Sequence, residues 1–249
     1  QAFNALIFLY RHVLQRPLVG LDACRAKRPK KLPVVLSRPE IKSLLYELQG
    51  HHRLLASLMY GAGLRVSEAL RLRVKDIDFY DARIHIHQSK GHKDRVVPIH
   101  PSLLIPLQRH LNLVKQWHET DLAAGFGEVY LPNALDKKYP KAASQWAWQF
   151  VFPSQKLSID PRSGKKRRHH LHASTIQSAI KHATKRAEIH KHVGPHSLRH
   201  TFATHSIENG IEIHRVKDIL GHESIETTKI YLHLTKQRGH DFTSPLEVL

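Results

Sequence analysis

An arginine flanked by two histidines marks the segment PHSLRHTFATH near the end of this chain. His196 and Arg199 are three residues apart, so on a helix they share one face. They also lie near the start of that helix, where free backbone N–H groups and the helix dipole favour an anion. This pair is therefore suited to binding a phosphate oxygen. The simpler interpretation of the next residue, His200, is a surface or core-edge histidine.

Four other elements combine a polar side chain with a turn or a helix end. They are Arg65 after the glycines of YGAGLR, Lys90 in SKGHKD, His222 after Gly221, and Tyr231 in SIETTKIYLHLTK. Each feature alone is weak, because an isolated arginine or lysine is usually solvated and a tyrosine in an amphipathic helix is usually a core-edge residue.

The charge of the chain favours a polyanionic partner. Lys and Arg number 39 against 21 Asp and Glu, which gives a net charge of +18 over 249 residues with histidine neutral. Nucleic acid is the leading partner for such a field, and a solvated basic surface is the alternative. Cys24 is the only cysteine, which excludes an intrachain disulfide and a cysteine zinc cluster. We expect neither a membrane span nor a signal peptide.

Periodicity and capping signals predict a mainly α-helical fold with a small antiparallel β-sheet. Helices are predicted at 3–14, 37–49, 51–72 with a break at the glycines, 173–187, after 196, at 213–220 and at 224–236. Alternating apolar residues predict three short strands near 77–79, 84–86 and 97–99. The hairpin tip between the last two strands contains Lys90 and Lys93.

Composition divides the chain into three parts. Prolines and a basic cluster over residues 16–38 are typical of a linker. We assign 1–18 to a helix of a separate domain, 19–36 to a linker and 37–249 to the main domain. Within the main domain, residues 118–170 break the helical rhythm with aromatics, prolines and DPRSGKKRRHH, and we interpret them as an insertion.

Taken in order, the singled-out residues resemble the signature of the tyrosine recombinase, or phage integrase, family. The set is Arg65, Lys90, His196-x-x-Arg199, Gly221-His222 and Tyr231. The resemblance runs from KLPVVLSRPEI to LGHESIETTKIYLH, nearly the whole chain. It implies a catalytic domain preceded by the last helix of an otherwise truncated helical core-binding domain. It also implies DNA strand cleavage without metal, ATP or another cofactor.

The resemblance implies a chemical role for each residue. Tyr231 would attack a DNA phosphodiester and form a 3′-phosphotyrosine, which conserves the bond energy. Arg65 and Arg199 would clamp the phosphate and stabilise the charge that develops on its oxygens. Lys90, with Lys93 the weaker candidate, would protonate the departing 5′-oxygen.

Three further residues would support this reaction. His196 would assist deprotonation of the tyrosine or bind the phosphate, and His222 would contact the phosphate. Glu68, one turn after Arg65, would orient that arginine, the alternative being an ordinary surface glutamate.

The insertion looks like the one that distinguishes integron integrases, which recombine cassette sites folded from one DNA strand. By position, contacts to protruding bases match Trp148, Pro161, His169 and His170, with Trp146 next. An unpaired base exposes a π-face on which an indole or imidazole can stack. The alternative is that the tryptophans are core residues and KKRRHH is a solvated strip. A metal site at HHLH lacks a second ligand pair.

The expected partners are double-stranded DNA sites and folded single-stranded hairpins. The resemblance implies a homotetramer in which the tail, about 236–249, packs onto a neighbour. The expected location is the bacterial cytoplasm, at the nucleoid when the protein is bound. The alternatives are a phage-type or chromosome-resolving recombinase, a type IB topoisomerase and a catalytically silent DNA-binding protein.

Overall fold

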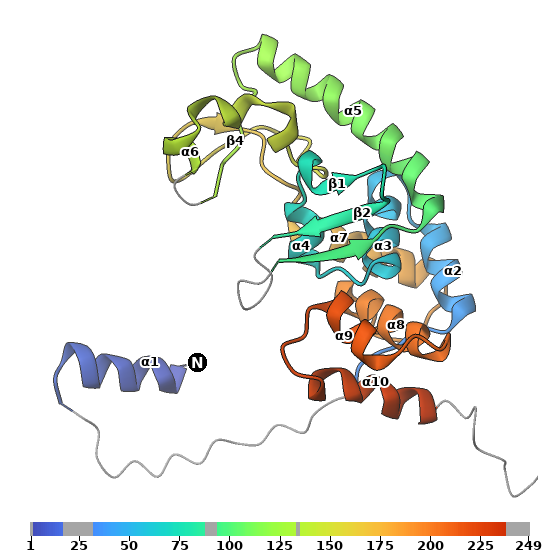
Figure 1. The fold of residues 1–249 in the computed structure, drawn as a ribbon. Helices are drawn as coiled ribbons and strands as arrows, with labels where there is room; N and C mark the ends of the chain where they lie inside the picture. Colours follow the sequence, from blue (N-terminus) through green and yellow to red (C-terminus); the bar gives the residue numbers. More distant parts are fainter. Residues whose placement is uncertain (1, 17–31, 88–93, 133–134, 238–249) are drawn as a thin grey trace, which may run out of the picture. The chain divides into compact units, whose positions relative to one another are not determined.

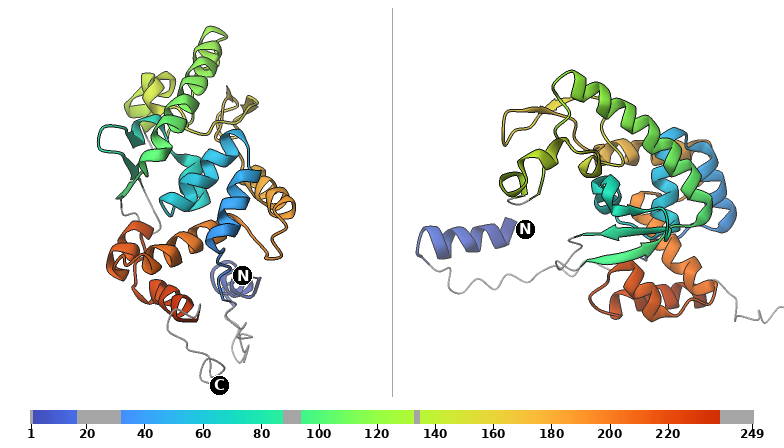
Figure 2. Two further views of the ribbon diagram at one scale, coloured as in Figure 1. Left: turned by 90° about the vertical axis from the view of Figure 1, so that its right-hand side faces the viewer. Right: turned by 45° about the horizontal axis from the view of Figure 1, so that its top comes forward.

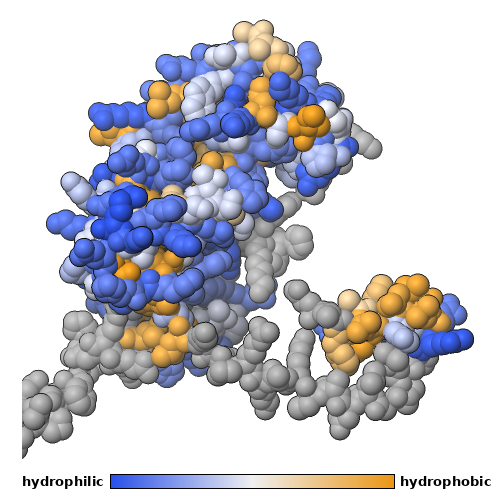
Figure 3. Space-filling model, turned by 180° about the vertical axis from the view of Figure 1, so that it is seen from behind, coloured by the Kyte–Doolittle hydropathy of each residue, from blue (hydrophilic) through white to orange (hydrophobic). Residues whose placement is uncertain are grey.

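The computed structural model describes residues 2–16, 32–87, 94–132 and 135–237, in two compact units that divide between Leu32 and Pro33. In the first unit, the helix α1 (Ala2–Phe8) continues as a π-helical turn, η1 (Leu9–Val13). Its apolar side chains are largely exposed, and they form the orange surface of the separate helix in Figure 3. The predicted helix is therefore present, with a π-helical second half.

The second unit is built around α3 (Gly50–Gly61) and α8 (Pro195–Glu208), which pack against each other. Around them lie α2 (Arg38–Glu47), α4 (Val66–Arg71) and α7 (Ala173–Arg186) (Figure 1). The predicted capping box begins α2, since Ser37 N–H donates to Glu40 at 2.6 Å and Glu40 N–H donates to Ser37 Oγ at 3.3 Å. Leu55, Leu58 and Leu198 are fully buried between these helices.

A three-stranded antiparallel sheet follows α4 and the 3-10 turn η2 (Val74–Asp76). Its strands, in order, are β1 (Ile77–Asp78), β2 (Arg83–Ile86) and β3 (Arg95–Pro98). Buried Ile84 pairs with Ile77 on one side and Val97 on the other, so alternate residues of each strand face the core. The prediction of a mainly helical fold with a small antiparallel sheet is confirmed.

The long helix α5 (Leu104–Ala123) follows the turn η3 (Pro101–Leu103) and corrects one expectation. The prediction that the helical rhythm breaks at residue 118 is wrong, because α5 continues for five residues beyond that position. Its last turns bury His118, whose ring is 5.9 Å from that of Trp146, and Asp121, which pairs with Arg168. Because polar residues occupy these buried positions of the helix, the pattern of hydrophobic residues does not show the helical period there.

The rest of the insertion segment lies next to the C-terminal part of α5 (Figure 2), and its residues Val151 and Phe152 belong to the main core. It comprises α6 (Leu135–Lys138), the 3-10 turns η4 (Pro140–Ser144) and η5 (Trp146–Trp148), and a two-stranded hairpin of β4 (Ser158–Ile159) and β5 (Lys166–Arg167). A separate apolar cluster holds it together: Val129, Leu131, Ala142, Ala143 and Phe150.

Two further helices complete the unit beside α8. They are α9 (Ile213–Leu220) and α10 (Glu226–Gln237), and both pack against α8. Gly221 ends α9 with φ +62°, the left-handed conformation that a cap glycine adopts without strain, as predicted. Among the described helices, none is long and apolar enough to cross a membrane.

Candidate active site

A glycine turn between α3 and α4 positions two arginines, Arg65 at the start of α4 and Arg199 on α8. Gly63 has φ +63°, and a Cβ at this position would lie 2.6 Å from the ring of Phe202, so only glycine fits. The turn presents the Gly63 carbonyl to Arg199, whose Nη1 donates to it at 2.6 Å. Arg65 follows immediately at the start of α4. The break predicted at these glycines is therefore a structural requirement of the site.

Arg199 is buried, with 4% of its surface exposed, and it is fixed by the main chain. Its Nη2 donates to the Leu220 carbonyl at the end of α9, at 2.5 Å. Burial and the neighbouring Arg65 lower the pKa of Arg199 to about 10, so the guanidinium remains charged at neutral pH. Two cations thus lie close together, an arrangement that favours an anion between them.

Glu68 connects the cations of the site. Its carboxylate accepts from Arg65 N–H at 2.8 Å and Arg65 Nη1 at 2.6 Å, and from Arg95 Nη1 and Nη2 at 2.9 and 2.7 Å. Burial alone would raise the pKa of Glu68, but the bonds and charge of Arg95, together with the bonds from Arg65, lower it to about 2. The Glu68 side chain is only 8% exposed, so it is not an ordinary surface glutamate.

Tyr231 lies beside these groups on α10 and is 3% exposed. Its hydroxyl is 2.9 Å from His200 Nδ1, and its ring stacks near that of His222, with centroids 6.4 Å apart. Burial raises the pKa of Tyr231, and the charges of Arg199 and Arg65 partly offset this effect. The phenol is therefore protonated at neutral pH and lies within electrostatic range of the two guanidiniums.

Both histidines that contact Tyr231 are neutral at neutral pH. Burial lowers the pKa of His200 to about 4, and His196 and Arg199 add to the effect. Burial also lowers the pKa of His222 to about 4, with Arg199 and Arg65 contributing. His222 Nδ1 is 2.9 Å from Thr228 Oγ1, which fixes the imidazole against α10. A neutral imidazole can exchange a proton with the phenol, depending on its tautomer.

The structure brings together most of the predicted catalytic residues. Arg65, Glu68, Arg199, His222 and Tyr231 lie around one point, where α4, α8, α9 and α10 meet. His196 is exposed at the start of α8, close enough to affect the pKa of His200. Lys90 and Lys93 lie outside the described residues.

Sequence reasoning missed two residues of this site, His200 and Arg95. The sequence favours a surface or core-edge position for His200, yet His200 makes the hydrogen bond to Tyr231. The sequence does contain a signal for Arg95. Arg95 is two residues before Val97 in β3 and four before Ile99, so it lies on the same, buried side of the sheet as these two residues. A charged residue in such a position needs partners, so a buried Arg95 predicts a carboxylate elsewhere in the chain that binds it.

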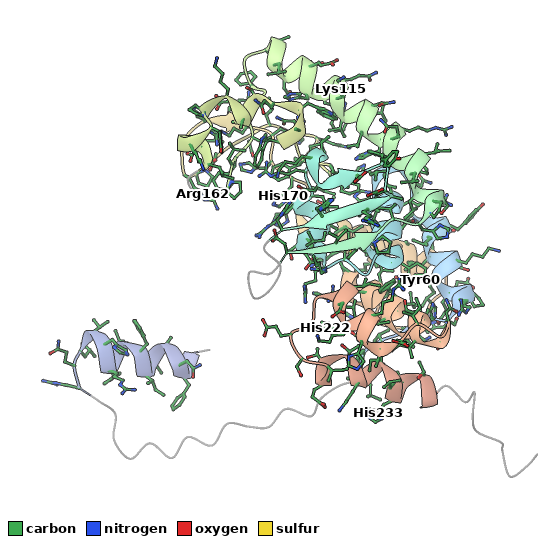
Figure 4. All side chains as sticks on the ribbon, viewed as in Figure 1. Tyr60, Lys115, Arg162, His170, His222 and His233 are labelled. Atoms are coloured by element: carbon green, nitrogen blue, oxygen red, sulfur yellow. The ribbon has the colours of Figure 1, made fainter. Side chains whose placement is uncertain are left out.

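A basic cleft of about 930 Å³ extends from this site toward the insertion. Its lining includes Arg65 and Glu68 at one end and Trp148, His169 and His170 at the other. In Figure 4, Arg162 and His170 are labelled at about the same height, and His222 lies below them. The cleft therefore joins the arginine site to part of the predicted base-binding set.

The insertion tryptophans differ in their surroundings. Trp148 is half-buried in the cleft, and Lys75 Nζ lies 4.2 Å from its ring centre. Trp146 packs against the main core and His118, which agrees with the alternative of a core residue. Pro161 is exposed beside buried Asp160, and among the described residues neither Trp146 nor Pro161 lines the cleft.

Comparison with known proteins shows the family of the chain. The sequence pattern of the phage integrase family matches residues 35–238. An integrase/recombinase of Escherichia coli is 44% identical over 250 aligned residues, which cover all of this chain and 74% of that protein. The crystal structure of XerA recombinase aligns with a TM-score of 0.57 and 27% identity, over 97% of this chain and 76% of that one.

A third similarity concerns the fold alone. XerH site-specific recombinase, in a structure bound to its difH substrate, aligns with a TM-score of 0.61 and 21% identity, over 97% of this chain and 63% of that one. The chain belongs to the phage integrase family, the tyrosine recombinases, which cleave and rejoin DNA at specific sites.

Proposed function

We propose that this chain is a recombinase of the integron integrase type, which cleaves cassette sites folded from a single DNA strand. The observation that carries the proposal is the basic cleft, because it connects Arg65 with Trp148, His169 and His170. A protruding base is flat and apolar on its faces and polar at its edges. An indole and two imidazoles at the end of a cationic cleft are suited to such a base.

In the proposed reaction, Tyr231 attacks the scissile phosphate and the 5′-oxygen departs. The phosphorus is then bound to the phenolic oxygen as a 3′-phosphotyrosine, and attack by a DNA hydroxyl reverses the step. The phenolic proton passes to His200 Nδ1, which is already 2.9 Å away. An incoming phosphate adds negative charge beside His200, which raises the pKa of the imidazole toward the value that this transfer needs.

The cations supply the remaining stabilisation. Arg65 and Arg199 bind the non-bridging oxygens, and His222 adds a contact from the turn after α9. We assign to Lys90 the proton that the 5′-oxygen requires, and to His196 a contact with the phosphate at the start of α8. With a proton donor, a clamp and a covalent nucleophile supplied by the chain, the reaction needs neither metal nor ATP.

The domain assignments extend the proposal to the assembly. Residues 1–18 are the last helix of a core-binding domain, 19–36 the linker and 37–249 the catalytic domain. The recombining complex is a tetramer on two DNA sites, linked by the tail. DNA as the partner is supported by the net charge of +18 and by the DNA-bound structure of XerH.

A generic phage-type or chromosome-resolving recombinase is the second candidate. It uses the same arginines and tyrosine on fully paired sites, and the matched relatives fit it equally well. The two candidates differ in their use of the aromatic end of the cleft, which a paired site leaves empty.

One experiment tests both the chemistry and the substrate. The protein is incubated with a nicked, folded single-stranded integron cassette site and, separately, with a nicked duplex chromosome-resolution site, followed by denaturing electrophoresis. We expect a covalent adduct with the folded strand, and Tyr231→Phe should abolish the adduct while DNA binding persists. An adduct with the duplex alone would favour the generic recombinase. An adduct that survives in Tyr231→Phe would remove Tyr231 from its role.

A further inference from the structure

Arg95 lies at the start of β3 and connects three parts of the active site. Its side chain is 8% exposed. Nη1 and Nη2 donate to the two carboxylate oxygens of Glu68 at 2.9 and 2.7 Å, a bidentate pair. Nε donates to the carbonyl of Ile219, near the end of α9, at 2.8 Å. One side chain therefore links the sheet, the start of α4 and the turn that precedes His222.

The first consequence concerns the capacity of Glu68. A carboxylate offers about four acceptor positions, and here four N–H groups occupy them, two from Arg65 and two from Arg95. Arg199 Nη1 is 3.8 Å from Glu68 Oε2, beyond hydrogen-bond distance, and it donates instead to Gly63. While Arg95 is in place, Glu68 is saturated and does not capture Arg199.

Loss of Arg95 would change this balance. Two acceptor positions of a buried carboxylate would become free, and an unsatisfied buried charge is strongly unfavourable. The guanidinium of Arg199 is already within 4 Å, so it would turn toward Glu68 and away from Gly63. Displacement of a catalytic group by about 1 Å can reduce a rate about a hundredfold.

The second consequence concerns the hairpin and the turn on either side of Arg95. Arg95 pairs with Ile86 at the end of β2, so Lys90 belongs to the segment that joins these two strands. On its other side Arg95 packs against Gly221, where an added Cβ would lie 3.0 Å from its Cδ. His222 follows that glycine directly. Arg95 thus holds the strand that leads to the proposed acid against the turn that presents His222.

We propose that Arg95 is a positioning residue for DNA cleavage, which keeps Arg65 and Arg199 available to the phosphate by saturating Glu68. It acts through these neighbours and through the Ile219 carbonyl, and it does not bind the phosphate itself. The inference rests on the proposed role of Tyr231 as nucleophile.

The test measures the single-turnover rate of adduct formation at saturating DNA, on whichever of the two nicked sites the wild type cleaves. We expect Arg95→Met to cleave about a hundredfold more slowly while its Kd for DNA stays within about twofold. Arg95→Lys should recover little of the rate, because an ammonium group does not span two carboxylate oxygens. If Arg95→Met does not fold, the cleavage rate of Arg95→Lys is the measurement that tests the inference.

A matched control is Arg168→Met. Arg168 likewise binds one carboxylate through two nitrogens, that of Asp121, and also donates to backbone carbonyls. It lies in the insertion segment, so its loss should lower the melting temperature and leave the saturated cleavage rate near that of the wild type.

A double-mutant cycle separates positioning from mere stability. If Arg95 acts by saturating Glu68, the change Arg95→Met should slow Glu68→Gln protein by less than about threefold, because a neutral amide does not attract Arg199. The inference would be overturned if the rate reductions of the two single variants multiplied in the double variant. It would also be overturned if Arg95→Met cleaved at the wild-type rate, or if Arg95→Met weakened only DNA binding. Absence of any adduct in the wild type would overturn the proposed function, and the inference with it.

Discussion

Replacement of Trp148 by alanine tests the proposed substrate most directly. A base that stacks on one aromatic ring contributes about 1 to 3 kcal/mol to binding. In this structure the ring already has cationic neighbours, since Lys75 Nζ lies 4.2 Å and the Arg73 guanidinium 5.7 Å from its centre. A base must displace the nearer one, Lys75, and such a contact is worth about 0.5 to 1 kcal/mol. The net loss in Trp148→Ala is then about 0.5 to 2 kcal/mol, a rise in Kd of about 2- to 30-fold.

The assay is a titration of folded single-stranded cassette hairpin, followed by fluorescence anisotropy. Kd for a fully paired duplex should stay within about twofold, because a paired base exposes no face to the indole. A hairpin whose protruding bases have been deleted should bind wild type and variant alike. Trp117 provides a matched control, since it is also a partly exposed tryptophan with an arginine over its ring, at 5.6 Å, but lies on α5.

The outcome that would refute the reasoning is an equal loss for hairpin and duplex together with an earlier thermal unfolding transition. Trp148 would then be a core residue of the insertion, and its replacement would act through a cavity. An effect of the same size in Trp117→Ala would also refute it, because the loss would not depend on the cleft.

Three other predictions concern the active site. A 5′-bridging phosphorothioate should rescue DNA cleavage by Lys90→Ala, because its thiolate leaves without a proton. It should not rescue Arg199→Ala, and equal rescue of both variants would mean that the acid is misassigned. Gly63→Ala should lower the free energy of unfolding by about 2 to 4 kcal/mol in urea titrations, because φ is positive and a ring lies 2.6 Å from the new Cβ. The free energy of unfolding should fall as pH is lowered from about 6.5 to about 4, because His200 and His222 bind protons in the unfolded chain over this range but not when they are buried. In His222→Gln the free energy of unfolding should depend less steeply on pH.

Local signals in the sequence were sufficient for most elements of the fold. The Ser37–Glu40 capping box, the cap glycine Gly221 and the alternation around Ile84 each report a short-range requirement of the backbone, and the structure has all three. The end of α5 was not predictable in this way, because His118 is buried against a tryptophan that lies far away in the sequence.

The same distinction applies to the site. The family resemblance predicts residues that would contact the substrate and one residue that would orient them, Glu68, but it does not predict the other residues that hold them. His200 and Arg95 are identified only when α8 meets α10 and β3 meets α4, since their partners Tyr231 and Glu68 are 31 and 27 residues away along the chain. The catalytic roles proposed for all these residues, His196 and Lys90 included, remain predictions.

The orientation of the Arg199 guanidinium has a consequence for how the sequence around this site can change. Its two fixed acceptors, the carbonyls of Gly63 and Leu220, are main-chain atoms that every amino acid supplies. No side-chain replacement at those positions deletes the bond itself, so the direction of the guanidinium is encoded in the path of the backbone. Surrounding residues other than Glu68 and Arg95 can therefore be exchanged during evolution or engineering while Arg199 keeps its orientation, as long as the turn at residue 63 is preserved.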